Sequence, residues 1–324
     1  MTVNGGTFSH RPVLLDEVLG LTAPGGERYW VDCTLGGAGH ATAILERGGT
    51  ETRLLGLDRD AVAVAAASER LAAVAGDRAI VVHSRFSAVD DEVQRRGFGR
   101  LVRGRYRVDG LIADIGVSSE QIDRAERGFS YGRPGPLDMR MGTEGETARE
   151  LIERLSVDEL ATLLWRYGEV PRAVRVAAAM KESVAAGLAE TTTELARAIE
   201  KAVGGGAKRS HNPATLPFQA LRIAVNDELG ELERLLEVLP DLLDLGGVGI
   251  IITFHSLEDR MVKQRFAALT QGPPVPRGLP VTGGRRAQFE LAERGAGASE
   301  QEKQENSRAR SARVRAIRRI AWEA

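Results

Sequence analysis

The first third of the chain alternates short runs of β-branched apolar residues with alanine-rich runs of helical periodicity, and this alternation limits the fold more than any other feature. Four strands are predicted: Tyr29–Thr34, Arg53–Leu57, Ala79–His83 and Val108–Asp114. Helices are predicted after the first three: Ala38–Glu46, Ala61–Ala75 and Ser87–Arg96. Each helix returns the chain to the edge where the next strand begins, so the strands pair in parallel. We therefore expect an α/β domain with helices on both faces of its sheet.

The strand pattern stops after Gly116. Residues 147–203 show helical periodicity alone, and Ser156 and Thr193 stand in positions typical of helix N-caps. A single long amphipathic helix is predicted over Pro213–Leu239, because its apolar residues recur at the spacing of one buried helix face. The middle of the chain is therefore expected to be all-helical.

Strand character returns near the end of the sequence. Val248–Phe254 predicts a fifth parallel strand, and Leu257–Leu269 predicts the helix that follows it. Ala287–Glu293 and Ala312–Trp322 are expected to close the sheet as a hairpin. The predicted fold is thus a doubly wound α/β domain made from both ends of the chain, 1–126 and 230–324, with an inserted helical domain at 127–229.

Composition narrows the class of protein. The formal net charge of −1 does not indicate a nucleic-acid binder, so such a function must rest on local clusters such as the arginines of Arg308–Arg319. No run approaches the roughly 18 apolar residues of a membrane span. A lone cysteine, Cys33, excludes an internal disulfide and a cysteine-based metal site. Because Met1–Arg11 lacks the pattern of a secretory signal, we expect a cytoplasmic protein without a membrane partner.

A glycine-rich turn follows the first predicted strand and indicates a nucleotide-like ligand. Its residues are Asp32, Gly36, Gly37, Ala38, Gly39 and His40. A backbone without β-carbons can approach a ligand closely, and Asp58 at the next strand tip can accept hydrogen bonds from ribose hydroxyls. Adenosylmethionine enzymes and NAD enzymes share this arrangement. The NAD-binding motif has glycine or alanine at the position of Thr42, which argues against NAD. Without other evidence, the glycines could also serve only a tight turn.

Two further strand tips carry candidate ligand-binding residues. Phe86 follows the third predicted strand, where its ring could stack on an adenine, although a lone phenylalanine is more often a core residue. Asp114 ends the fourth strand, and ligands of doubly wound sheets bind at this carboxyl edge. Asp114 could therefore face either the cofactor or the group that is modified.

Several long strings of the chain resemble one family, the bacterial RsmH proteins, formerly MraW, which are 16S ribosomal RNA cytosine-N4 methyltransferases. The most specific strings are His10–Glu17, Gly135–Met141, Phe218–Ile223 and Phe254–Arg260. Shorter matches are Gly36–His40, Leu57–Asp60, Asp114–Ser119, Arg127–Ser130 and Asn212–Ala214. The resemblance extends over nearly the whole chain, and strings of this length are far more specific than a glycine-rich loop.

The resemblance implies a Rossmann-like class I methyltransferase core with a helical domain inserted after the fourth strand. It also implies that S-adenosylmethionine is bound by Ala38, Gly39, His40, Asp58, Phe86, Asp114 and Gln121. Glu120 stands where the family commonly has proline. The implied substrate is the exocyclic N4 of a decoding-centre cytidine in 16S rRNA within the small ribosomal subunit.

Methyl transfer to an exocyclic amine requires alignment of the nitrogen and acceptors for its N–H groups. Asp114, Ser118 and His255 are the candidates for this role. DNA enzymes of this type often carry two prolines and an aromatic residue after the fourth-strand carboxylate or amide, and here Ile115-Gly116-Val117 follows Asp114 instead. No metal site is predicted, and Ser256 is expected to cap the helix that carries Glu258 and Asp259.

An RNA target needs a basic surface and an unpaired or flipped base. Candidate RNA contacts are Lys208, Arg209, His211, Asn212, Arg222, Arg260 and Lys263. Phe129, Tyr131 or Phe254 could stack on the base. A non-catalytic, adenosylmethionine-binding ribosome assembly factor is the alternative function, and the sequence leaves open whether the protein forms a homodimer.

Overall fold

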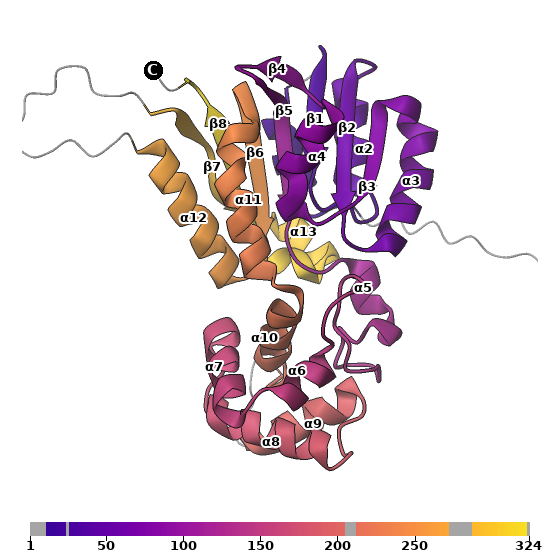
Figure 1. The fold of residues 1–324 in the computed structure, drawn as a ribbon, viewed down its shortest axis with the longest axis vertical. Helices are drawn as coiled ribbons and strands as arrows, with labels where there is room; N and C mark the ends of the chain where they lie inside the picture. Colours follow the sequence, from indigo (N-terminus) through magenta and orange to yellow (C-terminus); the bar gives the residue numbers. More distant parts are fainter. Residues whose placement is uncertain (1–10, 24–25, 205–211, 272–286, 323–324) are drawn as a thin grey trace, which may run out of the picture. The chain divides into compact units, whose positions relative to one another are not determined.

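The computed structural model describes residues 11–23, 26–204, 212–271 and 287–322 (Figure 1). Contacts between residues divide the chain into two compact units. Unit 1 comprises Met1–Gly116 and Glu231–Ala324, and unit 2 comprises Val117–Gly230. The assignment of 1–126 and 230–324 to a methyltransferase domain, and of 127–229 to an inserted one, stays a prediction. No helix within the described ranges combines the length and apolar character that a bilayer crossing requires.

The sheet of unit 1 has the strand order β3-β2-β1-β5-β6-β8-β7. Its parallel strands are β1 (Arg28–Asp32), β2 (Thr52–Asp58), β3 (Ala79–His83), β5 (Arg105–Asp114) and β6 (Leu243–Thr253). β8 (Arg313–Arg319) runs antiparallel to β6, and β7 (Phe289–Gly297) runs antiparallel to β8. A short strand that the sequence did not predict, β4 (Arg100–Val102), pairs with the start of β5. The predicted Rossmann-like α/β fold, with its closing hairpin, is confirmed.

Helices cover both faces of this sheet. They are α1 (Leu15–Leu21), α2 (Gly39–Gly48), α3 (Ala61–Ala75), α4 (Val89–Arg96), α12 (Ser256–Thr270), α13 (Glu300–Glu305) and most of α11 (Glu228–Leu242). Short 3₁₀ turns lie at Gly76–Arg78, Phe86–Ala88 and Ser307–Arg310. Of the helices, α1 and α13 were not expected from the sequence.

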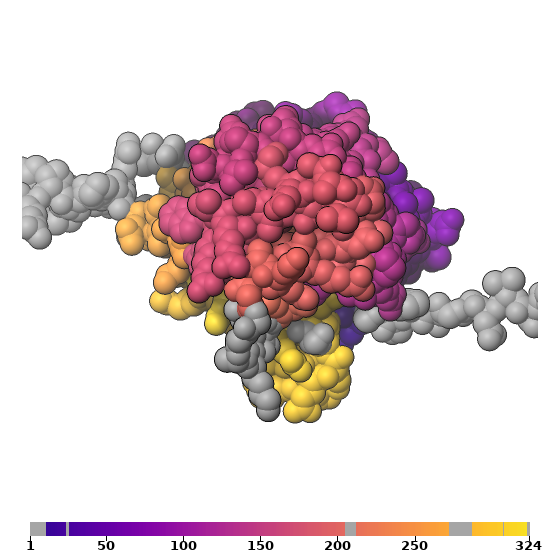
Figure 2. Space-filling model, turned by 90° about the horizontal axis from the view of Figure 1, so that it is seen from below, coloured from indigo at the N-terminus to yellow at the C-terminus, as the bar shows by residue number. Residues whose placement is uncertain are grey.

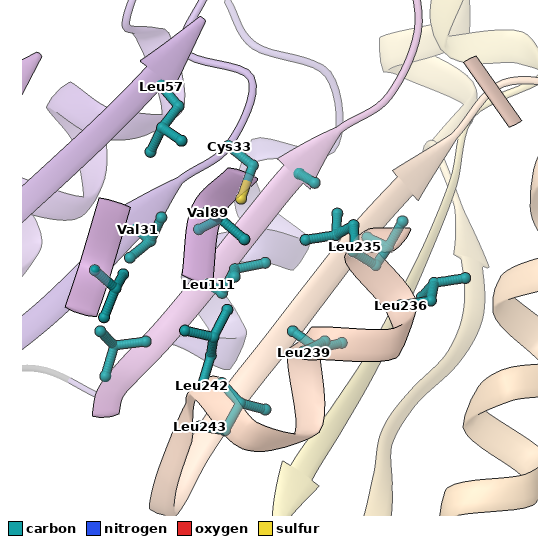
Figure 3. Packing of buried hydrophobic residues seen from close by; sticks show 14 of the residues in the cluster. Val31, Cys33, Leu57, Val89, Leu111, Leu235, Leu236, Leu239, Leu242 and Leu243 are labelled. Atoms are coloured by element: carbon teal, nitrogen blue, oxygen red, sulfur yellow. The ribbon is translucent and has the colours of Figure 1, made fainter. Parts of the chain in front are cut away.

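Side chains of the central strands point alternately into two hydrophobic clusters, as the period of two in a strand requires. Val31 of β1 and Leu111 of β5 belong to the cluster that packs against α4, α11 and α12 (Figure 3). Their neighbours Trp30 and Ile112 belong to the cluster with α1, α2 and α3. The sheet is therefore buried on both faces, which leaves its strand ends as the place where polar side chains can meet a ligand.

Unit 2 has its own hydrophobic cluster, which includes Leu164, Met180, Ile199 and Leu221. Its helices are α5 (Ser119–Asp123), α6 (Ala148–Arg154), α7 (Val157–Gly168), α8 (Ala173–Ala185), α9 (Thr192–Val203) and α10 (Thr215–Asn226), with a 3₁₀ turn at Ala125–Arg127. Figure 2 shows one face of these helices, magenta to salmon, as a space-filling surface.

Two predicted N-caps had different outcomes. Ser156 caps α7, and Glu159 completes a capping box, as the sequence indicated. The cap of α9 is Thr191 rather than Thr193, because Glu194 then occupies the third helical position and reaches back to the backbone of Thr191.

The single helix predicted over Pro213–Leu239 is wrong, because the chain forms two helices there. α10 ends at Asn226, Asp227 adopts a left-handed backbone with φ of 49°, and α11 begins at Glu228. A β-carbon on Gly230 would lie only 2.4 Å from the Asp227 carboxylate, so glycine makes room for this side chain over the first turn of α11. Both helices bury apolar residues at helical spacing, which is why periodicity did not reveal the break.

Candidate functional site

Three carboxylates stand at the carboxyl ends of neighbouring strands in unit 1. Asp32 ends β1, Asp58 ends β2 and Asp114 ends β5, and β1 lies between the other two strands. The structure therefore brings together the three strand tips from which the sequence predicted a ligand site. This edge is the usual ligand position in doubly wound sheets.

Asp58 fixes the glycine-rich turn to the tip of β2. Its Oδ2 accepts the Gly36 N–H at 2.8 Å, and its Oδ1 accepts the Asp60 N–H at 2.8 Å. Gly36 has a φ of +47°, a conformation that side-chain-bearing residues rarely adopt. A β-carbon on the exposed Gly37 would meet nothing within 4 Å, so the backbone of this turn presents an open face.

The segment at Pro12 and Val13 supports the other side of the turn. A β-carbon on Gly39 would lie 2.5 Å from Pro12 Cγ, so only glycine allows this close packing. Ala38, fully buried, caps α2 in a left-handed conformation with φ of 59°. His40 follows on α2, and its Nε2 lies 3.0 Å from the carbonyl oxygen of Val13. The predicted motif thus runs from the end of β1 at Asp32, through the turn at residues 36–38, into the first residues of α2.

Burial dominates the electrostatics of Asp32 and Asp114. It raises the pKa of Asp32 to about 7, although the Thr34 N–H donated to its Oδ1 opposes the shift and the charge of Asp58 adds to it. Burial raises the pKa of Asp114 to about 8, with further contributions from the charges of Asp32 and Glu258. The pKa of Asp58 is also raised, mainly by burial. This edge therefore holds protons that a nearby positive charge would release.

One carboxylate oxygen of Asp114 has no hydrogen-bond partner among the described residues. Its backbone N–H donates to Thr34 Oγ1 at 2.6 Å, which fixes the strand tip. Its Oδ1 is buried and has no hydrogen-bond partner among the described residues. A buried acceptor without a donor costs stability, so such an atom is a candidate ligand contact.

Phe86 stands where the third strand predicted it. It begins the 3₁₀ turn Phe86–Ala88, which is separated from the end of β3 by two residues, and its ring is partly buried against the core of unit 1. The ring therefore combines a core role with partial exposure, and its contact with a base stays a prediction.

Ser118 and Gln121 belong to unit 2, so the structure shows only their local roles. Ser118 caps α5: its Oγ accepts the Gln121 N–H at 3.2 Å, and Gln121 Oε1 accepts the Ser118 N–H at 3.0 Å. Glu120, at the position where the resemblance leads us to expect proline, pairs with Arg124 at 2.6 Å and is compatible with the helical turn. Gln121 is buried, and its contact with a cofactor stays a prediction.

His255 rather than Ser256 caps α12, which corrects the sequence-based expectation. Its Nδ1 accepts the Glu258 N–H at 3.5 Å, and its Nε2 lies 3.0 Å from Glu258 Oε1. Glu258 is fully buried, and its Oε2 accepts the N–H of Phe254 at 2.8 Å. This capping geometry gives His255 a structural role, and a catalytic one stays a prediction.

The predicted RNA contacts have different surroundings. Lys208, Arg209 and His211 lie outside the described residues. Asn212 donates to Glu200 at 2.9 Å and accepts the Ala214 N–H, and Arg222 forms a two-pronged ion pair with Glu228 at 2.8 and 2.9 Å. These bonds give Asn212 and Arg222 structural roles. Arg260 and Lys263 are exposed on α12.

The arginine cluster near the C-terminal end contributes largely to the fold. Arg315 pairs with Asp259 at 2.7 Å, and Arg318 donates to the carbonyl oxygen of Gly246. Arg319 is 4% exposed and lies between the rings of Phe289 and Trp322, 4.5 and 4.4 Å from their centroids. The sequence could not distinguish these contacts from a nucleic-acid surface, because both use the same residue type.

Three residues organise the site in ways that were not predicted from the sequence. Thr34 and Glu258 bond to strand-end backbone, and Glu302 of α13 accepts the Leu14 N–H at 2.7 Å. Glu258 carries a readable signal, since a glutamate three residues after a helix cap is typical of a capping box. The contact of Glu302 joins residues 288 positions apart and has no local signal.

Comparison with known proteins identifies the family of this chain. A model of the MraW methylase family matches residues 7–320. The ribosomal RNA small subunit methyltransferase H of Anaeromyxobacter sp. (strain Fw109-5) is 47% identical over 97% of this chain and 99% of that protein. The protein of the same name from Geobacter sulfurreducens is 46% identical over 97% and 100%. An rRNA methylase structure from Streptococcus thermophilus covers 95% of this chain and 94% of that chain, at 10% identity and a TM-score of 0.38. The family match and the relatives' identity over nearly the full length show that this chain is a methyltransferase of the MraW methylase family.

Proposed function

We propose that this enzyme transfers a methyl group from S-adenosylmethionine to the exocyclic N4 of a decoding-centre cytidine in 16S rRNA of the small ribosomal subunit. The observation that carries the proposal is its similarity to proteins named ribosomal RNA small subunit methyltransferase H, at 44–47% identity over nearly the whole chain. The N4 position and the decoding-centre target come from the family resemblance of the sequence strings.

The residues at the strand tips of unit 1 fit this methyl donor. An ionised carboxylate offers about four acceptor sites, and Asp58 uses two of them for Gly36 and Asp60, so two remain for ribose hydroxyls. The open backbone face at Gly36 and Gly37 admits a ligand at close range. Phe86 would face the adenine, and Gln121 is a further proposed donor contact implied by the family resemblance.

Asp114 is the proposed acceptor for the cytosine amine. The bound donor supplies an electrophilic methyl group on a sulfonium, and alignment of the amine is the main demand on the protein. A positive charge near Asp114 favours its ionised form, and its unused Oδ1 can then accept an N–H of the amine. The methyl–sulfur bond would break as the C–N bond forms, leaving a neutral thioether, and Asp114 would take the proton that the more acidic nitrogen then loses. Ser118 and His255 are secondary candidates for orienting the base.

The target base must be unpaired or flipped, because a helix hides the Watson–Crick edge of cytosine. We propose that the inserted helical domain, 127–229, recognises the surrounding RNA. Arg260 and Lys263, both exposed on α12, are the proposed phosphate contacts among the described residues.

The test is to incubate the protein with isotopically labelled S-adenosylmethionine and, separately, small subunits, free 16S rRNA and DNA. Mass spectrometry of the nucleosides should identify N4-methylcytidine in ribosomal RNA only, and an Asp58→Ala variant should incorporate little label. Methylation of DNA or of a ring carbon would overturn the proposed target. Binding of the donor without any transfer would support the assembly-factor alternative.

A further inference from the structure

Unit 2 carries an open groove of about 740 Å³ between α7 and α8. The lining residues are Asp158, Ala161, Thr162, Trp165, Arg172, Ala173, Val174, Arg175 and Ala178. None of these residues belongs to the strand-tip site of unit 1.

Trp165 is the most informative side chain in the groove. The side chain of Trp165 is 68% exposed. Tyr131, by contrast, packs edge-to-face on Phe218 with ring centroids 5.3 Å apart, and its hydroxyl shares a hydrogen bond with the hydroxyl of Thr215. Burial of a tryptophan ring removes about 150–250 Å² of surface from water. An indole left this exposed is therefore available to a ligand, while the aromatic ring of Tyr131 serves the core of unit 2.

Positively charged side chains line the same groove as the Trp165 ring. Arg172 caps α8 and Arg175 lies in its first turn, and both are exposed where they line the groove. Among the described residues that line the groove, Asp158 is the one carboxylate, so positive charge exceeds negative charge there. An aromatic face beside guanidinium groups is the combination that binds single-stranded nucleic acid, with a base on the ring and phosphates near the cations.

We propose that this groove binds an unpaired segment of the RNA substrate, with one base stacked on Trp165 and flanking phosphates beside Arg172 and Arg175. The proposal rests on the RNA substrate proposed above. A protein partner fits this groove less well. A stable protein–protein interface buries about 800 Å² on each side. The large exposed apolar side chains of the groove are Trp165 and Val174, and two side chains provide little of such an area. Stacking of this kind tolerates any base, so the groove would hold the RNA without reading its sequence.

Tryptophan fluorescence offers a direct test in the full-length protein. The chain has three tryptophans; Trp30 is 3% exposed, and Trp322 lies against Arg319. Titration with a short single-stranded RNA oligonucleotide should quench the fluorescence of Trp165. A Trp165→Phe variant should lose the quenching and keep most of the affinity, because phenylalanine retains a stacking face.

Affinity measurements extend the test. Trp165→Ala should weaken binding of the oligonucleotide roughly tenfold, and Leu188→Ala, which removes an equally exposed apolar residue outside the groove, should not. Replacing Arg172 and Arg175 with glutamine should lower the slope of log affinity against log salt by about 0.7 for each lost phosphate contact. Arg197→Gln, an exposed change on α9, is the matched charge control.

Methyl transfer to small subunits separates this proposal from the proposed function. If the groove binds RNA, Trp165→Ala raises KM for the RNA and leaves the affinity for S-adenosylmethionine unchanged. Equal KM values and equal oligonucleotide affinities for Trp165→Ala and the wild type would overturn the groove proposal. A wild-type enzyme that forms no N4-methylcytidine would instead overturn the proposed target.

Discussion

His40 Nδ1 lies 3.8 Å from Asp114 Oδ2, while its other ring nitrogen, Nε2, lies 3.0 Å from the carbonyl oxygen of Val13. A carbonyl oxygen can only accept, so Nε2 carries the hydrogen and Nδ1 is the bare nitrogen of a neutral ring. Burial lowers the pKa of His40 to about 4, which keeps the ring neutral at physiological pH. His40 therefore does not compensate the charge of Asp114, and this agrees with the raised pKa of that carboxyl.

The ionisation of Asp114 should be visible in the pH dependence of catalysis. Because its pKa is about 8 in the free protein, kcat/KM for the donor should rise with pH up to about 8 and then level off. Asp114→Asn should remove this rise and lower kcat by about 100-fold or more, the usual share of a proton acceptor. Steady-state kinetics from pH 6 to pH 9 measure both effects. An Asp114→Asn enzyme that binds donor normally and works at the full rate would exclude the acceptor role.

Stability should fall as pH rises, because Asp32 holds its proton more tightly in the folded chain. Its pKa is about 7 when folded and about 3.9 in an unfolded chain, so the folded state binds more protons across that window. Asp32→Asn keeps an oxygen for the Thr34 N–H and removes the titrating group. The slope of the free energy of unfolding against pH should therefore be shallower in this variant, by up to about 1.4 kcal/mol per pH unit. Urea unfolding at pH 5 and pH 8 measures this. The control is Asp91→Asn, exposed on α4; equal pH slopes for Asp32→Asn and the wild type would refute the account.

Glu302 should position the donor site without touching it. It holds the Leu14 N–H, and the adjacent Pro12 and Val13 support Gly39 and His40. Glu302→Ala should raise KM for the donor about tenfold, near the lower end of what one hydrogen bond to a charged group contributes, with little change in kcat. Glu302→Gln retains an acceptor oxygen and should restore KM. Glu300→Ala on the same helix is the control, and a similar KM for all three variants would contradict the positioning role.

Arg319 should act on stability rather than on RNA binding. Its buried guanidinium donates to the carbonyl oxygens of Leu243 and Pro240 and lies between two aromatic rings. Arg319→Met should lower the free energy of unfolding by roughly 2–4 kcal/mol, whereas Arg313→Met, exposed on the same strand, should change it by less than about 0.5 kcal/mol. Chemical unfolding provides the values. A stable Arg319→Met protein with weaker RNA affinity would reverse this interpretation.

The elements that could be predicted from the sequence are those with a long periodic pattern of apolar residues. Ala61–Ala75 was predicted with the bounds it has, because helical periodicity there is long and bounded by Asp60 and Gly76. Elements such as α1 and α13 are too short for a periodic pattern. The break at Asp227 depends on one backbone conformation, which apolar spacing does not record.

For the site, strand ends and glycines were sufficient to predict which residues share one edge of the sheet. Parallel pairing places all carboxyl ends together, so the sequence alone groups Asp32, Asp58 and Asp114. Hydrogen bonds between distant segments could not be predicted, and Glu302 with Leu14 is the clearest case. Nor could sequence tell a structural arginine such as Arg319 from an RNA contact.

Isothermal titration calorimetry with S-adenosylmethionine tests the central claim most directly, namely that the tips of β1, β2 and β5 hold the methyl donor. The account predicts one binding site per chain in the wild type, and binding at least about tenfold weaker in Asp58→Ala, which loses the proposed ribose acceptor and the anchor of Gly36. Absence of binding by the wild type, or equal affinity in the folded Asp58→Ala variant, would contradict it.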